Sequence, residues 1–209
     1  MTDANLALMT SIRTKWGGTI AEACKSSTVP ESFLAALTAN ESGGNPDAKR
    51  FEHGVLTSLW DVLAGRKAAY GSLGRSDIVN FIATQPVGPA LVAAPGSTSI
   101  ITRAVQRLDG LATSWGLTQV MGYEAIVFSI DTSDLLVPLS GLRVSLRMIS
   151  QFATVRDLDV TKNFDELFDC WNTGRPHSPT ADPQYIPNGL ARMQLYESLL
   201  HPDTGAVSA

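Results

Sequence analysis

The sequence TVPESFLAALTANESGGNP, residues 28–46, predicts a buried helix that stops at a pair of glycines. Phe33 and Leu37 lie one helical turn apart, which predicts that the face they share packs in a core. Gly43 can adopt the left-handed conformation that commonly follows a helix, so the helix is expected to end there. Glu41 is therefore expected in the last helical turn.

The start of the segment 28–46 and the residues before it also carry helix signals. Thr28 and Glu31 have the spacing of a capping box, with Pro30 in the first turn of the helix. Upstream, residues 4–26 suit a helix that Gly17-Gly18 is expected to weaken or break.

Later segments also show helical periods. Apolar residues recur at steps of three and four in three stretches, which predicts three further amphipathic helices. Their apolar positions are Leu139, Leu142, Leu146, Ile149 and Phe152; Phe164, Leu167, Phe168 and Trp171; and Ile186, Leu190, Met193, Tyr196 and Leu200. The predicted fold class is mainly α, with a small β element after the helix that carries Glu41.

Composition indicates a globular chain with one folded domain. The chain has 209 residues, 44% of them hydrophobic and 17% charged, so it can bury a sizeable core. Its net charge of -4 is spread along the sequence. Lys and Arg do not cluster and no apolar run reaches the length of a membrane span, so we expect neither nucleic acid nor membrane as a partner. We expect a monomer.

The two cysteines, Cys24 and Cys170, are too few for a disulfide scaffold. No other ligand type lies beside them at the spacing of a metal site, so we predict buried free thiols, no metal and no cofactor. Residues 1–5 lack the basic start and apolar run of a secretory signal. The expectation is synthesis in the cytoplasm without a signal peptide.

Glu41 is the sharpest candidate for chemistry. A carboxylate in the last turn of a helix faces the negative end of the helix dipole, and this field disfavours its ionised form. Glycoside cleavage needs such a group, because the acid must still hold a proton near neutral pH. A surface Glu that merely ends a helix is the alternative interpretation.

Four short motifs follow one another along the chain. They read Glu41-Ser-Gly-Gly-Asn-Pro-Asp-Ala48, Ser114-Trp-Gly-Leu-Thr-Gln-Val-Met-Gly122, Cys170-Trp-Asn-Thr-Gly-Arg175 and Tyr185-Ile186. Together they resemble the motifs of the soluble lytic transglycosylases (SLT) and their goose-type lysozyme relatives, glycoside hydrolase family 23. Thr118 stands where that family usually has Met. The resemblance implies a lysozyme-like (α+β) fold over residues 1–209.

The resemblance also implies roles for individual residues. Gly116 would let the backbone approach a sugar, since it has no Cβ. Gln119 and Asn172 would offer amides to hydroxyl and N-acetyl groups. Tyr185 would hold the catalytic acid in place, and Trp171, with Trp115 as a further candidate, would pack against sugar rings.

The sequence Arg50-Phe-Glu52 is similar to an Arg-Tyr-Glu sequence that follows the catalytic motif in a subgroup of this family. Glu52 is therefore a candidate to orient Glu41, to tune its pKa or to act as a second catalytic carboxylate. The alternative is a salt-bridged loop residue. Residues 53–113 make the spacing to the second motif longer than in compact members, which predicts an insertion that builds a wall or lid of a cleft.

The function that the resemblance implies is that of a peptidoglycan-cleaving muramidase. It would act on the MurNAc-GlcNAc β-1,4 bond, as a lytic transglycosylase with Glu41 as general acid. An inverting lysozyme- or chitinase-type hydrolase with Glu52 as second carboxylate stays open, as does a non-catalytic glycan-binding or structural module. Without a signal peptide, the chain would reach the cell wall by assisted release, through phage lysis as an endolysin, in a virion or by a secretion system.

Overall fold

The computed structural model describes residues 3–84 and 100–202, and the proline-rich boundary expected at residues 85–97 lies outside them. The chain divides into two compact units, residues 1–45 with 142–209, and residues 46–141. The predicted insertion at residues 53–113 lies wholly within the second unit. One lysozyme-like domain over the whole chain stays a prediction.

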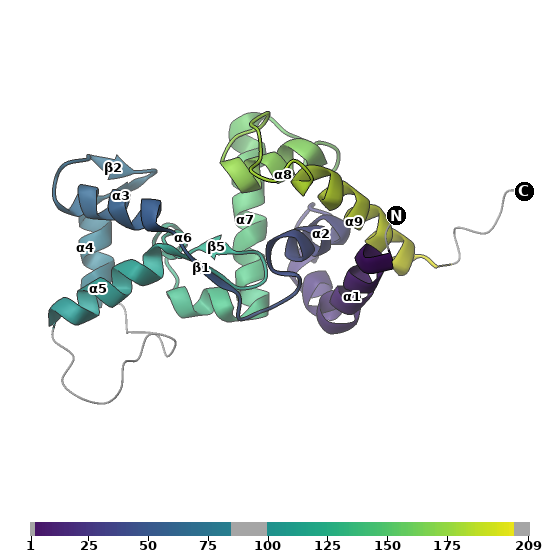
Figure 1. Cartoon of the computed structure of the whole chain (residues 1–209), viewed down its shortest axis with the longest axis horizontal. Helices are drawn as coiled ribbons and strands as arrows, with labels where there is room; N and C mark the ends of the chain where they lie inside the picture. The colour runs from purple at the N-terminus through teal and green to yellow at the C-terminus, as the bar shows by residue number, and fades with distance from the viewer. Residues whose placement is uncertain (1–2, 85–99, 203–209) are drawn as a thin grey trace, which may run out of the picture. The chain divides into compact units, whose positions relative to one another are not determined.

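The first unit is built from helices. They are α1 (Asp3–Cys24), α2 (Glu31–Ser42), α8 (Phe164–Thr173), α9 (Tyr185–Leu200) and the part of α7 (Pro138–Arg156) that begins at Leu142. Helix α2 packs against α1 and α9, and α8 packs against α9 (Figure 1). Every residue from Ser32 to Ala39 is buried, so α2 is covered on all sides rather than on the single face that its apolar spacing predicts.

Aromatic packing joins α2 to α8. The rings of Phe33 and Phe168 have centroids 4.5 Å apart, within the range of favourable aromatic pairs. Cys24 and Cys170 are buried and free, as predicted. The predicted stripe of α7 is confirmed at its centre, where Leu142 and Ile149 are fully buried.

Two local predictions for this unit are wrong. Helix α1 runs through Gly17 and Gly18 without a break, because tertiary packing outweighs the weak helix propensity of glycine. Helix α2 has no capping box: its N-cap is Pro30, whose carbonyl oxygen accepts the N–H groups of Phe33 and Leu34. The helix therefore begins too late for the Thr28 hydroxyl to serve as cap.

The second unit holds the β structure. A three-stranded antiparallel sheet has the order β1 (Lys49–Phe51), β4 (Thr113–Trp115), β5 (Val120–Met121), and a two-stranded hairpin joins β2 (Ala69–Tyr70) to β3 (Leu73–Gly74). Arg50 pairs with Ser114, and Ser114 with Met121. A small β element after Glu41 was predicted and is confirmed, in a chain that is mainly helical.

Helices surround a separate core in this unit. They are α3 (His53–Leu63), α4 (Arg75–Thr84), α5 (Ile100–Leu111), α6 (Glu124–Phe128) and the 3₁₀ helix η2 (Thr132–Leu136), of which Figure 1 shows α3, α4 and α5 grouped with the hairpin. The core is formed by Leu59, Val62, Leu73, Ile78, Phe81, Leu108, Leu111, Ala112 and Ala125. Within residues 3–84 and 100–202, no helix is both long and apolar enough to cross a membrane.

Candidate active site

The catalytic candidate Glu41 meets Tyr185 inside the first unit. Glu41 is the penultimate residue of α2 and is half-buried, while Tyr185 begins α9 and is 9% exposed. The Tyr185 hydroxyl donates a hydrogen bond to Oε1 of Glu41. Glu41 begins the first motif and Tyr185 begins the last. The two residues are 144 positions apart in the sequence, and their side chains are in direct contact.

A second set of polar contacts fixes the helix ends that carry this pair. The Asn40 side chain donates from Nδ2 to the carbonyl oxygen of Tyr185 over 2.9 Å. Arg192 donates from Nη1 to Oδ1 of Asn40 over 2.6 Å and from Nε to Oδ1 of Asn5 over 3.2 Å. Arg192 therefore ties α9 to both α2 and the start of α1. Burial lowers the pKa of Arg192, and the charge of Asp182 acts in the opposite direction.

The turn after Glu41 depends on glycine. Gly43 and Gly44 have φ angles of 62° and 83°, the left-handed region that side chains with a Cβ rarely adopt. The Trp16 indole on α1 donates from Nε1 to the carbonyl oxygen of Gly44 over 2.9 Å. Chain direction after Glu41 is thus set by α2, the glycine pair and α1 together.

Tyr185 remains a donor across the physiological pH range. Its pKa is raised above the ordinary value by burial first, then by the negative charge of Glu41 and by the hydrogen bond to it. Its ring also packs edge-on against Phe168, with centroids 6.2 Å apart. A hydroxyl donated to a carboxylate stabilises the ionised form of that carboxylate.

The third motif lies on α8, in the same unit. Trp171 is half-buried and Asn172 is exposed, and the helix ends at Gly174 with φ 81°. Sequence reasoning missed Asp169, a carboxylate only 4% exposed, which accepts the Ser178 backbone N–H over 2.8 Å. This hydrogen bond holds the segment between α8 and Tyr185 against α8.

In the second unit, Gln119 has a structural use. Its Nε2 donates to the carbonyl oxygens of Ala48 and Gly116, each over 3.0 Å, and its Oε1 accepts the Ser114 hydroxyl over 2.9 Å. Both amide hydrogens are therefore engaged within the unit. A role in binding sugar stays a prediction.

Gly116 and Trp115 also have local explanations. Gly116 has φ 74°, and a Cβ there would lie 2.4 Å from the carbonyl oxygen of Leu135. Glycine is required here by the fold alone. Trp115 is 4% exposed, donates to the carbonyl oxygen of Gly110 and has the Lys49 ammonium 5.2 Å from its ring centroid, so it packs as a core residue rather than against a sugar.

Glu52, the second carboxylate candidate, lies in the second unit. It forms the N-cap of α3, and its Oε1 accepts a hydrogen bond from Nε of Arg50 over 2.5 Å. The side chains of Arg50 and Glu52 are 72% and 33% exposed, so this ion pair is screened by water. These are the features expected of a salt-bridged loop residue.

Sequence reasoning also missed Asn40 and Arg192. A signal for Arg192 was present: it follows Tyr185 by seven residues, which places both on one face of a helix. Among the described residues, no group of three or more His, Cys, Asp or Glu side chains could hold a metal ion. Comparison with protein-family models, curated proteins and solved structures finds no match to this chain.

Proposed function

We propose that this protein is an enzyme that cleaves peptidoglycan glycan strands at the β-1,4 bond between MurNAc and GlcNAc, with Glu41 as general acid. The observation that carries the proposal is the hydrogen bond from Tyr185 to Glu41. A late Tyr that holds the catalytic acid is what the resemblance to the soluble lytic transglycosylases implies. A surface Glu that merely ends a helix has no need of a buried partner from a distant segment.

The chemistry follows from this pair. Glu41 donates its proton to the glycosidic oxygen as the bond to the anomeric carbon breaks, and the N-acetyl oxygen of the substrate assists at that carbon. The muramyl 6-hydroxyl then bonds to the anomeric carbon and returns its proton to Glu41, which closes a 1,6-anhydro ring. Glu41 is ionised between these steps, and the Tyr185 hydroxyl stabilises the negative charge at that stage.

The decisive test is Glu41→Gln, assayed by lysis of purified cell walls. General acid catalysis contributes roughly 10²–10⁴-fold, so we expect a loss of that order with the helical circular dichroism spectrum unchanged. Glu31→Gln is the matched control, since Glu31 begins the same helix, α2, and should keep near-parental lysis. Lysis by Glu41→Gln above a tenth of the parental rate would refute the assignment.

Mass spectrometry of the products separates the rival mechanisms. Our proposal expects 1,6-anhydromuropeptides without new reducing ends. Reducing-end products, with loss of activity in Glu52→Gln, would favour an inverting hydrolase, which needs a second carboxylate roughly 6.5–9.5 Å from the first. Cleavage of chitin but not of cell walls would identify chitin, rather than peptidoglycan, as the substrate. Binding to cell walls without any product would favour a non-catalytic glycan-binding module.

A further inference from the structure

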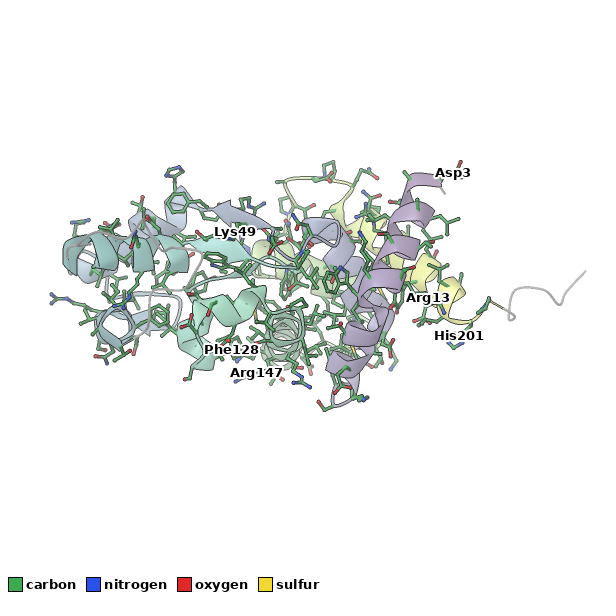
Figure 2. The ribbon with its side chains drawn as sticks, turned by 90° about the horizontal axis from the view of Figure 1, so that it is seen from below. Asp3, Arg13, Lys49, Phe128, Arg147 and His201 are labelled. Carbon is green, nitrogen blue, oxygen red and sulfur yellow. The ribbon has the colours of Figure 1, made fainter. Side chains whose placement is uncertain are left out.

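Arg192 lies where three helices of the first unit meet. Helix α9, which carries it, packs against both α1 and α2. Figure 2 shows α1, on which Arg13 lies, beside α9, which ends just before His201. Arg192 is half-buried at this place, and a cation withdrawn from water has to be satisfied by hydrogen-bond acceptors of the protein. Its two acceptors come from the neighbouring helices, Asn5 on α1 and Asn40 on α2.

The first consequence concerns the orientation of the Asn40 side chain. A guanidinium group has donors only, so the atom of Asn40 that faces Arg192 over 2.6 Å has to be the amide oxygen Oδ1. The amide nitrogen then points to Tyr185 and donates to its carbonyl oxygen over 2.9 Å. Arg192 therefore selects one of the two orientations that an Asn amide can take.

Asn40 in this orientation acts on Tyr185 at two points. The carbonyl oxygen that it binds belongs to the first residue of α9, so this bond fixes the backbone from which the Tyr185 side chain extends. Burial first, then the charge of Glu41 and the bond to it, raise the pKa of Tyr185, whereas a hydrogen bond from the Asn40 side chain lowers it. The Asn40 amide thus also reaches the hydroxyl that donates to Glu41.

We propose that Arg192 is a positioning residue for the reaction, and that through Asn40 it holds the Tyr185 hydroxyl at Oε1 of Glu41. This inference rests on Glu41 as the catalytic acid of the proposed function. Arg192 acts with two separate atoms of its planar group, Nη1 on Asn40 and Nε on Asn5. A Lys ammonium keeps the charge but is a single point on a flexible stem, so it lacks this fixed geometry.

Arg192→Lys therefore tests the role in the active enzyme, with kcat and KM measured on soluble, uncross-linked peptidoglycan strands. We expect kcat to fall about fivefold and KM to stay within about twofold, because the Tyr185 hydroxyl stabilises a charge that forms on Glu41 only during the reaction. Asn5→Ala is the matched control, since it removes the other acceptor of Arg192 and leaves the bond to Asn40. Arg13→Lys makes the same exchange on exposed α1. Both controls should keep the parental kcat within about twofold.

A double-mutant cycle of melting temperatures tests the same contact without any substrate. Tyr185→Phe should lower the melting temperature by about 2–4 °C in the parental chain and in Asn5→Ala. In Arg192→Lys it should lower it by less than about 1 °C, because a hydroxyl that is no longer held at Glu41 contributes little. If Arg192→Lys does not fold, Asn40→Asp takes its place in both measurements, since it keeps the acceptor for Arg192 and removes the donor to Tyr185.

The two measurements separate failure of this inference from failure of the proposed function. Equal losses from Tyr185→Phe in the parental chain and in Arg192→Lys would overturn the positioning role, whatever the activity. A parental kcat in Arg192→Lys, or the same fall in Asn5→Ala, would overturn it as well. Loss of the hydroxyl effect in Arg192→Lys, in a protein that cleaves no glycan, would overturn the proposed function and support the hydrogen-bonded connection from Arg192 to Glu41.

Discussion

Removal of one hydroxyl, in Tyr185→Phe, tests the contact on which the candidate active site depends. The substitution deletes the donor to Oε1 of Glu41 and keeps the ring that packs against Phe168. Tyr196→Phe is a matched control on the same helix. The Tyr196 hydroxyl is buried and, among the described residues, has no hydrogen-bond partner.

The two substitutions should affect the free energy of unfolding differently. A hydrogen bond to a charged group contributes about 1.5–3 kcal/mol, but Glu41 is half-buried and water can replace the lost donor. We therefore expect Tyr185→Phe to lower the free energy of unfolding by about 1 kcal/mol, or the melting temperature by about 2–4 °C. Tyr196→Phe removes a desolvated hydroxyl without a partner, so the free energy of unfolding should stay constant or rise by up to about 1 kcal/mol.

Activity provides the second measurement. Tyr185→Phe should slow lysis of cell walls about tenfold, since about 1.4 kcal/mol of stabilisation of the ionised Glu41 is lost. Tyr196→Phe should leave the rate unchanged. Thermal unfolding is followed by near-ultraviolet circular dichroism and lysis by turbidity. Equal losses of stability and activity in both variants would refute the reasoning, because the hydroxyl bonded to Glu41 would then matter no more than the one without a partner.

Three further predictions concern the second unit. Gly116→Ala should lower the free energy of unfolding by about 3 kcal/mol or more in denaturant titration, because of its positive φ and the contact with Leu135, whereas Gly54→Ala should change it by less than about 1 kcal/mol. Gln119→Ala should lower it by about 2–4 kcal/mol through three lost hydrogen bonds, and a merely weaker affinity for glycan at unchanged stability would contradict this. Burial raises the pKa of Glu124 from 4.5 to about 7, so the folded state binds its proton more tightly than the unfolded state. The free energy of unfolding should therefore fall as pH rises from about 4.5 to 7, and Glu124→Gln should flatten this slope.

Sequence reasoning reached those features that depend on local pattern. The end of α2 at Gly43 and the small sheet after it follow from the glycine pair and from the change of residue types, and both are present. The approach of Tyr185 to Glu41 came from the family resemblance. Helical periodicity alone relates only residues within one helix, so it could not pair two helices.

Features that depend on tertiary contacts were out of reach. Gln119 and Gly116 both lie in the second motif. Gln119 donates a hydrogen bond to Ala48, and Gly116 lies close to Leu135. No rule of sequence spacing predicts either contact. The capping-box prediction for α2 was wrong for a similar reason. A Thr at the right spacing predicts a cap only when the helix begins beside it, and the carbonyl of Pro30 sets a later start.

Tertiary structure adds a hydrogen-bond donor to the electrostatic surroundings of Glu41. From sequence, only the negative end of α2 acts on its carboxylate, and this field disfavours the ionised form. In the structure the N-terminus of α9 begins at Tyr185, whose hydroxyl contacts the same carboxylate. The hydroxyl donor favours the ionised carboxylate and therefore opposes the effect of the negative end of α2. In the reaction that we propose, Glu41 would hold a proton before bond cleavage and bear negative charge after it. A general acid that later takes its proton back needs both states to be accessible, and the Tyr185 hydroxyl would contribute by stabilising the ionised state.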